Sequence, residues 1–234
     1  MTRLKWVEIS TSFPLKSVPS LLQEKKYIPE INFCGFELLE ISRSAVTAKF
    51  IQEFKLSDVQ IDPFGKEVSS TITRYSTTIF TILEINGRKL MRIAQPPRTL
   101  RDLVLNISSA LDGDFFAQEI RIDVIKFLDY FKGKVQLGHA RVRSALFVDV
   151  PLTESSTGRV LVDSSRDAIF DFNKCLKGGR LDKVTLELVN EFGISPLEIT
   201  YRGSLVHDEW LDDSTLHELE SHIAFQLNKN GSLE

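Results

Sequence analysis

The chain has 234 residues, of which 42% are hydrophobic and 26% are charged, and its formal net charge is −3 at pH 7. This composition excludes an intrinsically disordered chain and is sufficient to bury a core. No apolar run approaches the length of a membrane span, and the first ten residues lack the apolar segment of a secretory signal peptide. Two cysteines without metal-binding or redox spacing indicate a reducing compartment, so we expect a cytoplasmic protein with no membrane association.

The first third of the chain contains mostly strand patterns. Hydrophobic alternation and turn residues define these elements. We expect a strand at 4–9, a helix at 17–27, paired strands at 36–41 and 44–54, a loop at 57–66, and a strand with one polar face at 68–75.

The clearest local pattern lies in residues 76–111. A run rich in β-branched and aromatic residues precedes Asn86-Gly87, and a second strand pattern follows. Asn-Gly is a strong hairpin signal, because both central residues of a type I′ turn need positive φ. After two prolines, Thr99 is expected to cap an amphipathic helix that reaches Leu111. The stretch therefore predicts a hairpin, a loop and a helix.

The second half is less regular. Residues 115–132 fit both a strand alternation and a helical face, and we favour a helix for the later part, closed by Gly133. Further along, we expect a strand at 135–150, a loop at 153–158, short strands at 159–162 and 169–172, a break at Gly178-Gly179, strands at 183–192 and 197–202, and a polar tail from 228.

Two helix starts resemble each other. Residues 99–103 read TLRDL and residues 215–219 read TLHEL, and apolar residues follow at the same spacing. A duplication would give an N-terminal α+β half at 1–114, a C-terminal α+β half at 115–228 and a frayed tail at 229–234. Each half would have the order β-α-β-β-β-β-α. The alternative is that any capped amphipathic helix after a hairpin shows this similarity.

Together these patterns predict an α+β fold with mostly antiparallel sheets and few helices. If the duplication is real, two pseudo-repeated halves form either a saddle-like sheet or two packed α+β subdomains. This order of elements resembles, in topology alone, the two-repeat saddle of TATA-binding-protein-like domains. No diagnostic motif of that family is present.

Positive charge is concentrated before and at the helix that starts near residue 100. Residues 1–117 contain 15 Lys+Arg and 13 Asp+Glu, whereas residues 118–234 contain 14 and 19. The basic cluster consists of Arg88, Lys89, Arg92, Arg98 and Arg101, with no acidic residue among them. A helix N-terminus with nearby cations attracts anions, so we interpret the cluster as a nucleic-acid or other anion-binding site. The alternative is a solvated strand face, which the acidic overall balance favours.

The corresponding stretch of the second half is acidic. Carboxylates gather there around the second helix start: Asp208, Glu209, Asp212 and Asp213. Such hard oxygen ligands suit Mg²⁺ or Mn²⁺. No recognised metal-ligand spacing, phosphate-binding loop or nucleophile motif accompanies them. We therefore predict no metal and no cofactor, and keep these four residues as the only metal candidates.

The sequence favours a non-enzymatic binding protein that acts through a protein partner, and in one interpretation through the phosphate backbone of DNA or RNA. The alternative is a divergent metal-dependent nuclease or phosphodiesterase that uses the acidic cluster. Opposite charge at the two similar helix starts also allows a homo-oligomer, formed by head-to-tail contact between copies. The alternative is a salt-insensitive dimer through an apolar sheet face or an edge strand.

Overall fold

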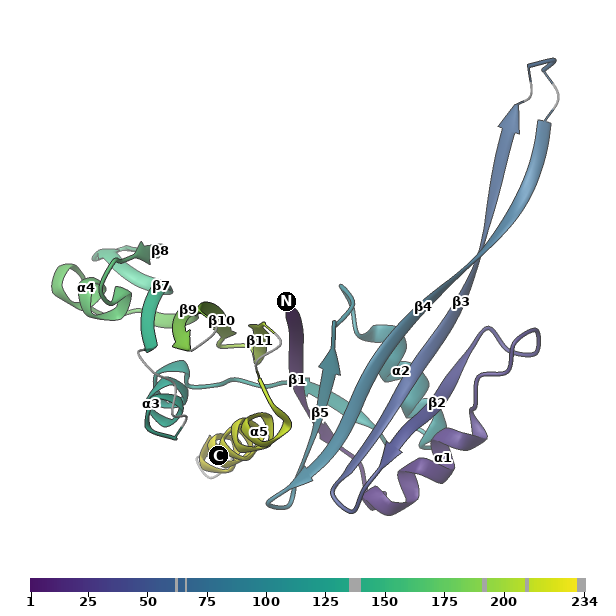
Figure 1. The fold of residues 1–234 in the computed structure, drawn as a ribbon, viewed down its shortest axis with the longest axis horizontal. Coiled ribbons are helices and arrows are strands. Elements are labelled where there is room, and N and C mark those ends of the chain that lie inside the picture. The colour runs from purple at the N-terminus through teal and green to yellow at the C-terminus, as the bar shows by residue number, and fades with distance from the viewer. Residues whose placement is uncertain (62, 66, 135–139, 191–192, 209–210, 231–234) are drawn as a thin grey trace. The chain divides into compact units, whose positions relative to one another are not determined.

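The computed structural model describes the chain except for residues 62, 66, 135–139, 191–192, 209–210 and 231–234. The described residues form eleven mostly antiparallel strands and five α-helices (Figure 1). The predicted α+β class is therefore confirmed. The chain divides into two compact units, each built from segments distant in sequence. Unit 1 contains Met1–Glu8, Ile85–Leu90 and Gln118–Glu234, and unit 2 contains Ile9–Glu84 and Met91–Ala117.

Unit 2 is an antiparallel sheet with two helices. Its strands follow one another in the order β2 (Cys34–Ile41), β3 (Ala45–Ile61), β4 (Glu67–Ile85) and β5 (Arg88–Ala94), and β5 continues from unit 1. The helical elements are the 3-10 turn η1 (Leu15–Ser17), α1 (Val18–Glu24) and α2 (Arg101–Ala110). Large buried side chains from strands and helices form its core: Val18, Leu22, Phe36, Phe50, Phe80 and Ile107.

The hairpin between β4 and β5 is formed as predicted. Asn86 and Gly87 have φ of 51° and 76°, the left-handed values that a type I′ turn requires. The predicted helix also forms, but its cap differs. Leu100 is the N-cap residue and makes no side-chain cap, while the Thr99 hydroxyl accepts a hydrogen bond from the Arg101 N–H at 3.3 Å.

The predicted loop at 57–66 is wrong at residues 57–61, which are strand, whereas residues 63–65 form the expected turn. Strand β3 continues to Ile61 and β4 begins at Glu67, and the two strands stay in register from Ala45 opposite Leu83 to Ile61 opposite Glu67. Apolar and β-branched residues lie on both sides of this tip, at Val59 and Ile61 and at Thr71 and Ile72, and such residues favour extended strands. Figure 1 shows that the outer part of this hairpin extends beyond the other strands of unit 2.

Unit 1 contains the second sheet region and three helices. Its strands are ordered β1 (Thr2–Ser10), β11 (Ser204–His207), β10 (Gly193–Thr200), β9 (Arg180–Asn190), β7 (Ala140–Thr153) and β8 (Ser156–Asp163). The short strand β6 (Phe116–Glu119) pairs with β1. The helices are α3 (Val124–Lys134), α4 (Ala168–Cys175) and α5 (Asp213–Asn230). Its core includes Trp6, Phe127, Val142, Leu186, Ile199 and Ile223.

Several expectations for the second half need correction. The predicted strand at 169–172 is the helix α4, because the Asp167 carboxylate caps it by accepting hydrogen bonds from the N–H groups of Ile169 and Phe170. The predicted loop at 153–158 shrinks to a tight turn between β7 and β8. Gly133 does not end α3, which reaches Lys134. Strand β11 was not predicted, and the expected strand residues 135–139 lie outside the described chain.

The internal duplication is not confirmed. The first part of the chain has the predicted order, β1-α1-β2-β3-β4-β5-α2. The second part has the order β6-α3-β7-β8-α4-β9-β10-β11-α5, with a helix and a strand that the first part lacks. The boundary at 114/115 stays a prediction. In the described part of the chain, no helix is both long enough and apolar enough to cross a membrane.

Candidate nucleic-acid interface

The basic cluster predicted from sequence is divided between the two units. Arg88 and Lys89 belong to unit 1, where the Arg88 guanidinium pairs with Glu8 at 2.6 Å. Arg92, Arg98 and Arg101 belong to unit 2. There, Arg98 and Arg101 are exposed at the start of α2. The cluster therefore consists of two groups, and one of its members already neutralises a carboxylate.

The acidic candidates that the structure describes do not form a ligand set. Asp208 lies 4.0 Å from the N-terminal amine, and Asp213 is the first residue of α5. Asp212 caps that helix, since its Oδ1 accepts a hydrogen bond from the Thr215 N–H at 2.8 Å. The hydroxyl and backbone N–H of Thr215 hold the pKa of Asp212 below its usual value. Glu209 lies outside the described residues, and among the rest no group of three His, Cys, Asp or Glu side chains could hold a metal ion.

A different basic surface lies on unit 1. Its six cationic side chains, which we call the basic face, are Arg3, Lys5, Arg121, Arg159, Arg180 and Arg202. They line three adjoining hollows of about 600, 350 and 520 Å³, all of which share Arg180. The residues come from β1, β8, β9, the segment after β6 and the turn between β10 and β11.

Backbone contacts fix the turn between β10 and β11 that carries part of this face. The Tyr201 N–H donates to the carbonyl of Asp182 at 2.7 Å, and the Tyr201 carbonyl accepts from the Ile122 N–H at 2.8 Å. Gly203 has φ of +67°, and a Cβ there would come within 2.4 Å of the Ile120 side chain. A side chain here would be strained by the positive φ and would crowd Ile120, so the position favours glycine. Tyr201 lies at the edge of the largest of the three hollows.

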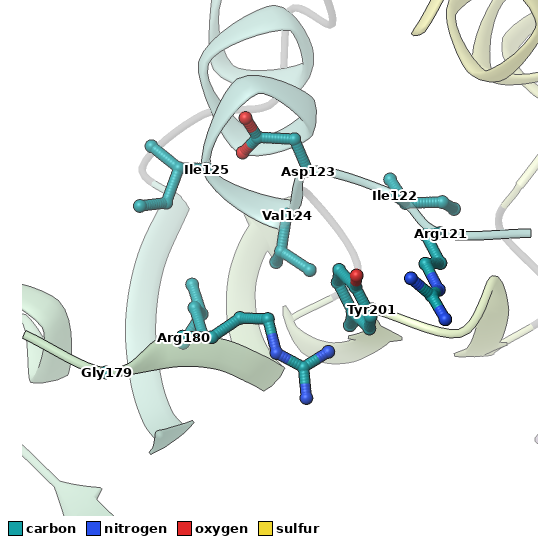
Figure 2. A pocket seen from close by; sticks show the side chains of 9 residues that line it. Arg121, Ile122, Asp123, Val124, Ile125, Gly179, Arg180 and Tyr201 are labelled. Carbon is teal, nitrogen blue, oxygen red and sulfur yellow. The ribbon is translucent and has the colours of Figure 1, made fainter. Parts of the chain in front are cut away.

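A glycine pair positions Arg180 at the start of β9. Gly178 and Gly179 have φ of +81° and +85°, and a Cβ on Gly179 would meet the Val150 side chain at 2.7 Å. The glycines let the backbone lie close to Val150 at the start of β9. Arg180, the next residue, lies beside the Tyr201 ring, with its guanidinium carbon 3.9 Å from the ring centroid (Figure 2). At that distance the cation and the aromatic ring attract each other as a cation–π pair.

Carboxylates neutralise only part of the basic face. Lys5 Nζ donates to Glu119 Oε1 at 3.2 Å. The arginine pairs are longer, between 3.7 and 3.9 Å: Arg159 and Arg180 with Asp182, Arg180 with Asp149, and Arg202 with Glu119. These separations exceed hydrogen-bond length, so the guanidinium N–H groups keep donors for a ligand. Arg3 and Arg121 form no ion pair with any residue that the structure describes.

The two parts of the surface differ in chemistry. The lining of the largest of the three hollows includes the apolar side chains of Ile122, Val124 and Leu181. The Arg180–Tyr201 pair, Arg121 and Asp123 also line it (Figure 2). Its volume falls within the range of small-molecule sites. The neighbouring hollows are lined almost entirely by charged and polar side chains. The arrangement places a region suited to a flat, partly apolar group beside a region suited to anions.

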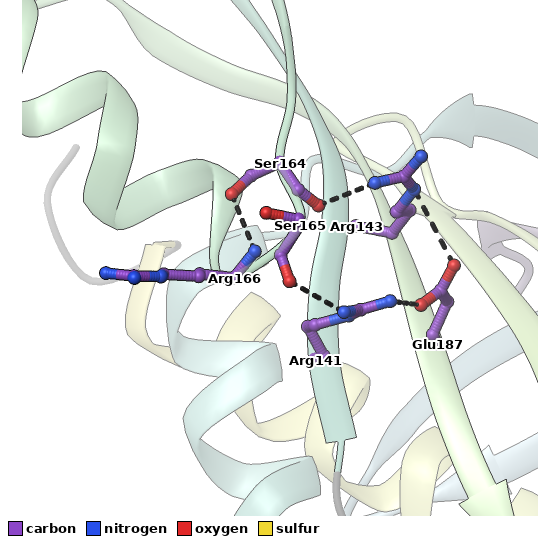
Figure 3. Close-up of polar contacts among 6 residues, drawn as sticks. All are labelled: Arg141, Arg143, Ser164, Ser165, Arg166 and Glu187. Atoms are coloured by element: carbon purple, nitrogen blue, oxygen red, sulfur yellow. Dashed lines mark hydrogen bonds and ion pairs between the residues drawn. The ribbon is translucent and has the colours of Figure 1, made fainter.

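Two other arginines of unit 1 have a structural role. Arg141 and Arg143 on β7 pair with Glu187 on β9 and donate to the carbonyls of Ser165 and Ser164 at 2.7 and 2.9 Å (Figure 3). These interactions tie the segment before α4 to the sheet. Their guanidinium groups donate hydrogen bonds within the protein.

The sequence contains no run that could reveal the basic face. Its members extend from residue 3 to residue 202, each among neutral or acidic neighbours. The nearest signal in the sequence is Gly178-Gly179, which indicates a break before Arg180. Where the Arg180 side chain lies after that break depends on packing against Val150, which the sequence does not show. A scan against protein-family models and a search of curated proteins find no match to this chain.

Proposed function

We propose that the protein binds nucleic acid through the basic face of unit 1, and that it prefers single strands. The observation that supports this most is the excess of cations around the hollows, six against the four carboxylates Glu119, Asp123, Asp149 and Asp182. Guanidinium groups bind phosphate oxygens through paired hydrogen bonds. Successive phosphates of one strand can thus contact the polar hollows.

The Arg180–Tyr201 pair supports the preference for a single strand. Unpaired bases stack on aromatic rings and on guanidinium planes, whereas bases in a duplex are already stacked on each other. The hollow next to the pair has apolar walls and Arg121 at its edge. A splayed base there would leave its phosphates near Arg180 and Arg202.

Binding of a labelled single-stranded oligonucleotide, followed by fluorescence anisotropy, tests the proposal. Charge reversal of Arg3 and Arg121 together should weaken binding at least tenfold, since these two cations form no ion pair within the described chain. The salt dependence should also become shallower, by about 0.7 in the log–log slope for each phosphate that the variant no longer binds. A duplex of the same sequence should bind more weakly than the single strand.

Two controls separate this face from other positive charge. Arg166→Glu makes the same charge change as either of these reversals alone, at another exposed position of unit 1, and should leave affinity nearly unchanged. Arg98→Glu with Arg101→Glu tests the cluster expected from sequence. No binding at low salt would refute the proposal, and weaker binding only with the Arg98 and Arg101 reversals would move the site to unit 2.

A further inference from the structure

The outer half of the β3–β4 hairpin forms an arm with an open edge. Strand β2 pairs with β3 only as far as Gln52, opposite Cys34. Beyond that point β3 pairs with β4 alone, through to Ile61 opposite Glu67. We call residues 53–75 the arm (Figure 1). A two-stranded ribbon is marginally stable by itself, so an arm of this length gains from a further strand.

One face of the arm carries apolar side chains that nothing in the described structure covers fully. Phe54, Leu56 and Ile72 are 41%, 46% and 45% exposed. By strand alternation and register they continue the face on which Phe50 and Phe80 are buried in unit 2. The sheet face that forms the core of unit 2 therefore continues along the arm, where its apolar side chains are exposed to solvent.

The two edges of the arm differ in how well they resist pairing. The β3 edge carries Glu53, Lys55 and Asp58, and the Glu53 N–H already donates to the Phe33 carbonyl at 2.7 Å. The β4 edge has no charge, proline or glycine from Ser69 to Thr73. Charged residues protect edge strands from pairing, and a neutral stretch of β-branched residues leaves an edge open.

We propose that the β4 edge pairs with the β4 edge of a second copy of this chain, antiparallel and with a twofold axis at Thr71. Residues 69–73 can pair with the same residues of a second copy. With Thr71 opposite itself, Ser69 faces Thr73 and Ser70 faces Ile72, so no two like charges are opposed. The pairing is isologous and closes at two copies, because the outer edges that remain are the charged β3 edges.

The paired arms would form a four-stranded sheet with one apolar face. Leu56 lies directly opposite Ile72 in each arm, and a twofold axis perpendicular to the sheet puts both pairs on the same side. Three or more strands with a hydrophobic face are sufficient for a stable sheet. Nucleic acid is a poorer occupant, because the described arm carries Lys55 and Arg74 against Glu53, Asp58 and Glu67.

Sedimentation of the full-length protein tests the pairing with a matched pair of variants. Thr71→Lys places two lysines opposite each other on the axis and should halve the mass to the 26.6 kDa of one chain. Ser57→Lys adds the same charge to the residue directly opposite Thr71 in the arm, but on the β3 edge, and should leave the dimer intact. A mixture of Thr71→Lys and Thr71→Glu chains should recover the dimer.

Cross-linking checks the register independently of charge. Residues directly opposite in antiparallel strands have Cα atoms about 4.5–5.5 Å apart, within disulfide range. With Cys34 and Cys175 replaced by serine, Thr71→Cys should form a disulfide dimer on mild oxidation, and Ser57→Cys should not. A wild-type monomer at every concentration measured, a dimer that survives Thr71→Lys, or equal cross-linking of both cysteine variants would overturn the proposal.

Discussion

The indole N–H of Trp6 donates a hydrogen bond to Oε1 of Glu220 at 3.1 Å, and both side chains are almost completely buried. The contact joins β1, near the beginning of the chain, to α5, near its end. Together with the pairing of β1 with β11, it connects Met1–Glu8 to unit 1, although most of that unit follows residue 117. A buried carboxylate that loses a hydrogen-bond donor is costly, so this pair should be sensitive to substitution.

The first prediction concerns this pair. Trp6→Phe removes the donor while keeping an aromatic ring, and should lower the free energy of unfolding by about 1–3 kcal/mol. Urea denaturation followed by circular dichroism measures the change. Glu218→Leu, at an exposed site on the same helix, is the surface control and should stay within about 0.5 kcal/mol of wild type. An unchanged midpoint for Trp6→Phe would show that the hydrogen bond does not stabilise the fold.

The second prediction compares two glycines with positive φ. A Cβ on Gly87 would have no atom within 4 Å, so Gly87→Ala should cost only the backbone strain, about 1 kcal/mol. A Cβ on Gly203 would meet Ile120 at 2.4 and 2.5 Å, so Gly203→Ala should cost clearly more. Denaturant midpoints of the two variants give the comparison. Equal destabilisation would mean that the turn between β10 and β11 adjusts freely.

Sequence reasoning succeeded where the cause was local. Asn86-Gly87 fixes its hairpin through its own backbone preferences, and the structure shows the expected φ values. The region at 169–172 shows the limit of a short apolar run, which fits a strand and a helix equally well. There the Asp167 side chain caps the first turn and stabilises a helix. Asp is a common N-cap residue, so the sequence alone could have predicted this cap.

The basic face could not have been predicted, for a physical reason. It exists because β1, β8, β9 and the turn between β10 and β11 come together, and those neighbours are set by strand order. Single residues such as Arg3 and Arg121 carry no pattern in the sequence. The basic cluster that did stand out, from Arg88 to Arg101, is divided between the units, and Arg88 pairs internally with Glu8.

The third prediction concerns acid sensitivity at the contact between α3 and α5. The His222 ring stacks on Tyr130, with centroids 4.1 Å apart, and burial lowers the pKa of His222 below the ordinary 6.5. The folded state therefore favours the neutral imidazole. Its contribution to stability is fully present above about pH 6.5 and is lost as the pH falls through the lowered folded-state pKa.

His222→Phe tests this relationship, because phenylalanine keeps a flat ring without a proton site. As the pH falls from 7.5 to 5, the free energy of unfolding should decrease more for wild type than for His222→Phe. Two-dimensional NMR of the wild-type imidazole should give a pKa below 6.5. Parallel pH profiles for the two proteins would contradict the prediction.

The fourth prediction separates stacking from charge in the proposed nucleic-acid interface. Tyr201→Leu removes the ring beneath Arg180 and should weaken single-strand binding by about 1–3 kcal/mol, the usual contribution of a stacked base. Because Tyr201 carries no charge, the slope of log affinity against log salt should stay the same. Arg121→Glu should instead make that slope shallower, since it removes a cation that binds phosphate.

Tyr201→Phe is the control, because it keeps the ring and the stack, and it should bind as wild type does. Anisotropy titrations at four or more salt concentrations supply both quantities for each variant. If Tyr201→Leu bound as tightly as Tyr201→Phe while Arg121→Glu still bound more weakly, the surface would bind phosphate alone, and the preference for single strands would have to come from elsewhere.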